Sequence, residues 1–290
     1  MWLRRSLVAV ARPALSAIRH RLPVANTLTK LTGHASRPHH HHLSRALVAG
    51  VAVASGASTL ASCDASLLKR ADGLFDSNEY AALAELLRKA LASKPDDAQL
   101  QWRLARGLKK LADAETAKPA KEALTMEGLA CAEKAIMQAP DCGPAHKWYA
   151  IMLSGSGAFK STSDKIKQSF TVKQHFDKAA ELSPKDATSR HLVGVWCFEV
   201  AKLSWFEQKA AAALFAAPPT ASYEEAYGHF AAAEAIEPGF YPQNKLLLAQ
   251  VCSKLGRKEE AQKWLDACLA SPAKTPEDEE TLQAAAKLKL

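Results

Sequence analysis

A pattern that ends in proline recurs along this chain and limits the fold more than any other feature. In each copy an apolar residue is followed three positions later by alanine, and five positions after that by proline. The copies are Leu87-Ala90-Pro95, Ala132-Ala135-Pro140, Phe176-Ala179-Pro184 and Phe230-Ala233-Pro238. A spacing of three places both residues on one face of a helix, and proline ends a helix because it lacks the backbone N–H. The pattern therefore predicts one kind of helix, repeated along the chain.

A second helix is expected upstream of each proline-ended helix, with a small residue at its packing position. These small residues are Ala71, Ala105, Ala150, Gly194 and Ala249. Small side chains allow two helices to approach closely. Such a pair of helices resembles a tetratricopeptide unit, which recurs about every 34 residues. The predicted fold is all-α, a tetratricopeptide-like α-solenoid of about five helical hairpins.

The spacing of the prolines predicts that some units are longer than the standard one. Successive unit ends at Pro95, Pro140, Pro184, Pro238 and Pro272 are 45, 44, 54 and 34 residues apart. We therefore expect inserts between the two helices of three units, at residues 111–127, 154–165 and 203–222, projecting from one face. The repeat domain is assigned to residues 64–275. Residues 276–290 are predicted to form a charged capping helix that ends the solenoid.

The basic charge of the chain is concentrated at its N-terminus. Residues 1–63 contain eight Lys and Arg and no acidic residue, and the first acid is Asp64. From Asp64 onward, 30 Lys and Arg balance 30 Asp and Glu. A neutral body lacks the overall positive charge that attracts phosphates, so no nucleic-acid partner is predicted.

The N-terminal segment has the composition of a targeting sequence. Residues 1–45 are rich in Arg, Ser and Ala, which predicts a mitochondrial presequence and a mitochondrial location. Residues 46–61 form an uncharged run of 16, shorter than the roughly 20 residues that span a bilayer. The segment 46–63 is therefore interpreted either as a marginal membrane anchor or as a flexible tether.

No pattern of catalytic, cofactor-binding or metal-binding residues supports an enzyme. The string Gly155–Thr162 resembles a phosphate-binding loop, but Phe159 replaces the glycine that precedes the lysine. The six cysteines lack metal-binding spacing and are interpreted as reduced core thiols. The histidine run at 39–42 is interpreted as low-complexity leader. We predict a protein that is not an enzyme and has no cofactor or metal site.

Beyond the helical repeat, particular residues resemble the regulator of microtubule dynamics family over most of residues 75–270. They include His146–Ala150, Ile166–Lys167, Ser169–Phe170, His175–Phe176, Pro184–Ser189, Trp196–Phe198, Leu214–Ala216, Pro218–Pro219, Tyr223–Ala226 and Phe240–Tyr241. The resemblance implies a non-enzymatic helical-repeat protein linked to microtubules and spindle behaviour. It further implies members at mitochondria, one type of which tethers mitochondria to the endoplasmic reticulum and handles phospholipid.

One face of the first helices is expected to line a concave groove. Its residues follow the spacing i, i+4, i+7. In the central units they are Trp102, Arg106, Lys109, Lys147, Ile151, His191, Val195 and Phe198, and in the last unit they include Gln250 and Ser253. The cations are predicted to hold a carboxylate or phosphate of a partner peptide or lipid head group, with apolar contact from Trp102, Ile151 and Phe198. The alternative is a solvated face without a ligand.

Three functions are compatible with these features. The main prediction is a mitochondrial scaffold that binds a partner peptide or helix in the groove. The alternative is a phospholipid-transfer or membrane-contact protein, in which the groove and the insert Ala201–Pro219 enclose an apolar cavity and residues 46–61 contact a membrane. A third, microtubule association, rests on the family resemblance alone, and the neutral body argues against it.

Overall fold

The computed structural model describes residues 65–156, 162–204, 208–209, 212 and 219–290, and the side chains of residues 162–167 are not among those described. The predicted presequence 1–45, the segment 46–63 and the histidine run at 39–42 lie outside this part of the chain. Within it, the regular elements are helices.

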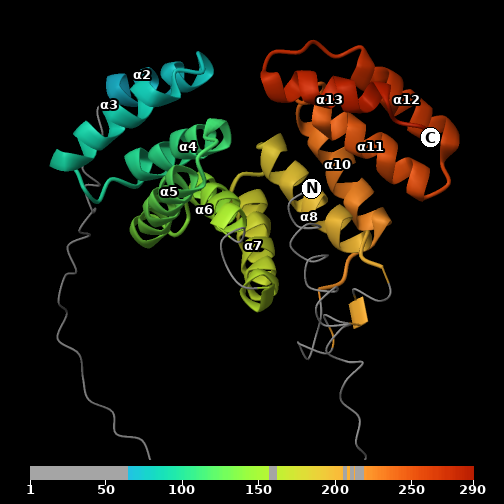
Figure 1. Ribbon diagram of the computed structural model, residues 1–290, viewed down its shortest axis with the longest axis horizontal. Helices are drawn as coiled ribbons and strands as arrows, with labels where there is room; N and C mark the ends of the chain where they lie inside the picture. The colour runs from blue at the N-terminus through green and yellow to red at the C-terminus, as the bar shows by residue number, and fades with distance from the viewer. Residues whose placement is uncertain (1–64, 157–161, 205–207, 210–211, 213–218) are drawn as a thin grey trace, which may run out of the picture.

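The helices form consecutive pairs, followed by one more helix. The pairs are α2 (Ala65–Asp76) with α3 (Tyr80–Ser93), α4 (Ala98–Ala114) with α5 (Lys118–Gln138), α6 (Gly143–Ser156) with α7 (Thr162–Leu182), α8 (Ala187–Ala201) with α10 (Tyr223–Ile236), and α11 (Pro242–Lys254) with α12 (Lys258–Leu269). The last helix is α13 (Pro276–Ala286). Figure 1 shows the pairs arranged in an arch that runs from α2 and α3 to α11, α12 and α13. The predicted all-α, tetratricopeptide-like solenoid is confirmed.

The small residues predicted at packing positions lie where helices meet. Ala71, Ala105, Ala150 and Ala249 are fully buried, with 0% of each exposed. Gly194 of α8 faces the ring of Phe230 on α10. These positions therefore fix how closely the two helices of a pair approach each other.

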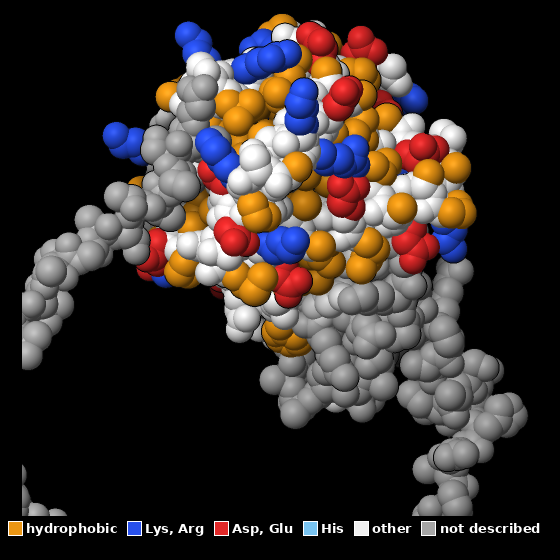
Figure 2. Space-filling view, turned by 90° about the vertical axis from the view of Figure 1, so that its left-hand side faces the viewer, with side chains coloured by type: hydrophobic (Ala, Val, Ile, Leu, Met, Phe, Trp, Pro, Cys, Tyr) orange, Lys and Arg blue, Asp and Glu red, His pale blue; other side chains and the backbone are white. Residues whose placement is uncertain are grey.

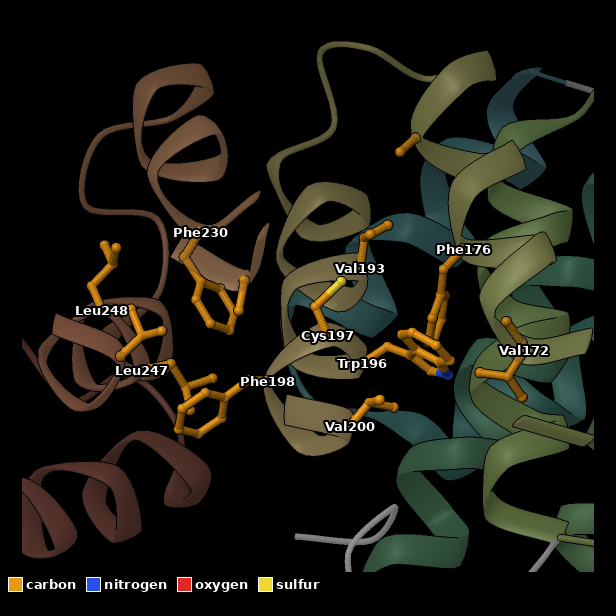
Figure 3. Packing of buried hydrophobic residues seen from close by; sticks show 14 of the residues in the cluster. Val172, Phe176, Val193, Trp196, Cys197, Phe198, Val200, Phe230, Leu247 and Leu248 are labelled. Atoms are coloured by element: carbon orange, nitrogen blue, oxygen red, sulfur yellow. The ribbon is translucent and has the colours of Figure 1, made fainter. Parts of the chain in front are cut away.

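Helix α8 connects two parts of the main core. In Figure 3, Trp196 points from α8 toward Phe176 and Val172 of α7, whereas Phe198 points to the opposite side, toward Leu247 of α11. The indole Nε1 of Trp196 donates a hydrogen bond to the Ser169 carbonyl oxygen at 3.0 Å. Such a buried N–H with a partner stabilises a core tryptophan.

The first predicted insert does not project as a loop. Helix α4 runs to Ala114 and α5 begins at Lys118, so the extra residues lengthen the two helices. Pro119 lies in the first turn of α5, where its missing N–H leaves no helical hydrogen bond unmade. Thr125 and Gly128 are buried within this lengthened helix α5. Residues 157–161 of the second insert and most of 205–218 of the third lie outside the described residues.

Helix α13 covers the last pair. Leu282, Ala285 and Leu288 pack in one cluster with Leu246 and Ala249 of α11. Its start is fixed by a capping box, in which the Thr275 side chain accepts a hydrogen bond from the Asp278 backbone N–H. The helix therefore shields apolar surface that the last pair would otherwise expose.

Candidate partner-binding face

The first helices of the pairs, α2, α4, α6, α8 and α11, carry the residues predicted to line a groove. We call the surface that they form the inner face. Lys110 near the end of α4 lies 3.3 Å from a carboxylate oxygen of Glu277 at the start of α13. An ion pair between helices so far apart along the array shows that the array curves enough to bring the end of α4 next to the start of α13.

At the N-terminal end of the inner face, one carboxylate lies between two arginines. Asp72 of α2 accepts hydrogen bonds from Arg103 Nε and Nη2, both at 2.9 Å, and from Arg106 Nη2 at 2.7 Å. The Arg106 guanidinium also lies 3.9 Å from the ring centroid of Phe75. Burial acts to raise the pKa of Asp72, but the bonds and charges of the two arginines outweigh it and lower that pKa. The cluster is compact and keeps one positive charge in excess.

The other two predicted cations also have acidic partners within the chain. Lys109 pairs with Asp113 one helical turn away, and Lys147 Nζ lies 2.7 Å from an oxygen of Asp186 at the N-cap of α8. The predicted cations Arg106, Lys109 and Lys147 thus lie on the inner face, but each forms an ion pair with an acid of the chain, and Arg106 shares Asp72 with Arg103. A ligand anion would have to share these cations with their present partners.

The predicted apolar residues divide into a buried and a partly exposed set. Trp102, His191 and Phe198 are 7%, 4% and 2% exposed, so most of each side chain belongs to the core. Ile151 and Val195 are partly buried and pack against the same core cluster from α6 and α8. Only this second pair offers apolar surface in the middle of the inner face, among the eight residues predicted there.

His191 is held in the core by a polar contact. Its Nδ1 lies 2.9 Å from Asn244 Oδ1. Because an amide oxygen only accepts, Nδ1 carries the ring hydrogen and donates a hydrogen bond to that oxygen. Burial lowers the pKa of His191 to about 4, although the Asn244 hydrogen bond and the charge of Glu277 act in the opposite direction. The ring is therefore neutral near neutral pH, and its role here is structural.

A pocket of about 330 Å³ lies at the C-terminal end of the inner face. Its lining residues are Phe198, Lys202, Tyr223, Gln250, Ser253, Lys254, Leu288 and Lys289. Phe198, Gln250 and Ser253 are residues that helical spacing placed on this face. The three lysines were missed, because Lys202 and Lys289 follow the ends of their helices and Lys254 lies outside the i, i+4, i+7 spacing.

Comparison with known proteins identifies the family. A family model described as regulator of microtubule dynamics protein 1-3 matches residues 67–289. The chain belongs to the regulator of microtubule dynamics family. The bovine regulator of microtubule dynamics protein 1 is 41% identical over 223 residues, which cover 77% of this chain and 70% of the bovine protein. The rat protein 3 is 33% identical over 217 residues, 73% of this chain and 45% of the rat protein.

A solved structure supports the fold assignment for this family member. A tetratricopeptide-repeat protein of Thermus thermophilus superposes with a TM-score of 0.54 at 17% identity, covering 77% of this chain and 98% of that protein. Family and fold together support a helical scaffold. Within the described residues, no helix combines the length and apolarity needed to cross a membrane, and no three His, Cys, Asp or Glu side chains gather as metal ligands.

Proposed function

We propose that this family member is a non-enzymatic scaffold at mitochondria, which binds a partner peptide or helix on its inner face. The observation that carries the proposal is the central apolar surface of Ile151 and Val195. It is flanked by the arginine cluster, which consists of Arg103 and Arg106 with Asp72, and by the lysine-lined pocket beside α11. An amphipathic helix or extended peptide carries apolar and charged side chains at comparable intervals, which such a surface can match. The basic N-terminal segment supports the mitochondrial location.

The phospholipid alternative needs an apolar cavity large enough for acyl chains. The pocket at the C-terminal end is lined mainly by residues with polar groups. The insert Ala201–Pro219, which would close such a cavity, lies largely outside the described residues. Because the lining of the pocket is more polar than apolar, peptide binding is the better-supported function.

Surface charge also bears on nucleic acid and microtubule binding. On the face at the α2–α5 end, Figure 2 shows Lys and Arg interspersed with Asp and Glu over the part that the structure describes. A surface with both signs of charge attracts a polyanion only weakly. The microtubule role rests on the family name, and we keep it as a second candidate.

Photo-crosslinking in mitochondria tests inner-face binding. A photoreactive amino acid at Val195 should form a specific adduct with a partner protein, whereas the same group at exposed Ala82 of α3 should not. Ile151→Arg should abolish the Val195 adduct, because it places charge in the apolar part of the face. Identical adducts from Val195 and Ala82 would contradict the proposal.

A further inference from the structure

Some cations of the inner face form ion pairs with acids of the chain, and others do not. The three cations predicted there are each held by an acid of the chain, Arg106 by Asp72, Lys109 by Asp113 and Lys147 by Asp186. At the C-terminal pocket, Lys254 and Lys289 have no acidic partner among the residues that the structure describes. The pocket therefore contains two lysines without an acidic partner in the described part of the chain, whereas the excess charge at the other end of the face belongs to two arginines that share Asp72.

The third lysine of the pocket, Lys202, lies near an aromatic ring and an acidic side chain. Lys202 Nζ lies 2.9 Å from Glu199 Oε1 and 4.7 Å from the centroid of the Phe198 ring. Glu199 is 4% exposed and so is largely withdrawn from solvent. Glu199 is paired with Lys202, and the described pocket lining contains three lysines and no Asp or Glu, so the lining is positively charged.

The remaining lining is suited to a short polar segment. Tyr223, Gln250 and Ser253 carry groups that can donate or accept hydrogen bonds, and Leu288 supplies apolar contact. Lys254 lies in the last turn of α11, and Lys289 follows the end of α13, so cations from two elements converge on one volume. Converging ammonium groups favour a ligand with more than one anionic group.

We infer that this pocket binds the carboxylates of an acidic segment in the partner peptide, next to an apolar side chain that contacts Leu288. This inference rests on the proposed function, since it assigns the chemistry of the partner at one end of the inner face. A carboxylate-rich peptide fits better than a phospholipid, because the lining is more polar than apolar and carries three lysines.

Fluorescence anisotropy with the full-length protein tests the inference. The probe is a labelled Glu-rich peptide with a single Leu, and its control is the same peptide with Gln in place of every Glu. The variant Lys254→Glu/Lys289→Glu reverses the pocket charge. The matched control Lys263→Glu/Lys287→Glu makes the same change in net charge at exposed lysines that do not line the pocket.

The wild type and the control variant should bind the Glu-rich peptide equally and the Gln peptide weakly. The pocket variant should lose roughly tenfold in affinity, and wild-type binding should weaken as salt rises. Equal binding by the two variants would overturn the inference. So would lysine-dependent sedimentation with phosphatidylcholine vesicles that contain phosphatidylserine, if the peptide showed no dependence on Lys254 and Lys289.

The crosslinked adduct at Val195, measured in Ile151→Arg and in the pocket variant, distinguishes failure of this inference from failure of the proposed function. Loss of that adduct in Ile151→Arg but not in the pocket variant would retain inner-face binding and overturn the acidic-segment assignment. Loss of the adduct in both variants would support both statements. Retention in both would overturn both.

Discussion

Gly194 of α8 packs directly against the ring of Phe230 on α10. A Cβ atom added at position 194 would lie 2.7 Å from both Cδ1 and Cε1 of that ring. Phe230 is fully buried and cannot rotate away without disturbing its neighbours. This contact explains why the fourth pair has glycine at the position where the other pairs have alanine.

Gly194→Ala should therefore destabilise the protein by about 1–3 kcal/mol, because it overpacks a filled core. Urea unfolding of the full-length chain, followed by helical circular dichroism, measures the change in the free energy of unfolding.

Gly228→Ala is the matched control on α10. No heavy atom lies within 4 Å of a Cβ at that position. Alanine has the higher helix propensity, so this substitution should stabilise the protein by about 0.5–1 kcal/mol. Equal effects of the two substitutions would show that the Gly194–Phe230 contact is not as tight as described.

Removal of the Asp72 charge should destabilise the contact between α2 and α4. Asp72→Asn leaves Arg103 and Arg106, whose side chains are only 11% and 14% exposed, without their carboxylate. We expect a loss of about 2 kcal/mol in the free energy of unfolding, reduced from the value for a fully buried pair because Asp72 is 38% exposed. Thermal or urea unfolding measures it.

Asp113→Asn provides the comparison for that prediction. Asp113 pairs with Lys109 on one helix and is 50% exposed, so its loss should change the free energy of unfolding by less than about 0.5 kcal/mol. A larger effect at Asp113 than at Asp72 would contradict the assignment of the arginine cluster as a stabilising contact.

Stability should fall as the pH is lowered, partly through His191. Its pKa is about 4 in the folded protein, below the 6.5 of an ordinary histidine, so the unfolded chain takes up a proton first. The stabilisation is complete above about pH 6.5 and is lost as the pH falls toward 4. Between about pH 7 and pH 5 the loss from this group should be about 2 kcal/mol.

The His191→Gln variant isolates this contribution. It should be less stable than the wild type near neutral pH, yet its free energy of unfolding should fall less between those two pH values. Urea midpoints at each pH provide the comparison. The same pH dependence in both proteins would exclude His191 as a source.

The repeat could be predicted from the sequence because it depends on spacing within one helix. Ala71, Ala105 and Ala150 occupy packing positions that follow from helical geometry, and all three are buried as that geometry requires. The tetratricopeptide-like fold follows from the recurrence of such positions.

The chemistry of the inner face was harder to predict, since it depends on contacts between helices. Arg106 and its partner Asp72 are 34 positions apart, and Lys147 and Asp186 are 39 apart. Contacts between residues so far apart in the sequence depend on how neighbouring helices are rotated and shifted against each other. The spacing of residues within one helix does not specify this arrangement. The pocket likewise includes both Lys289 and Phe198, which are far apart in the sequence and meet only because the helices between them pack together.

Hydrogen–deuterium exchange on the full-length protein, with and without the partner captured at Val195, is the most direct test of inner-face binding. The predicted result is slower exchange in α6, α8 and α11, the first helices of the central and last pairs. Slower exchange confined to the second helices α5, α7 and α12 would contradict it.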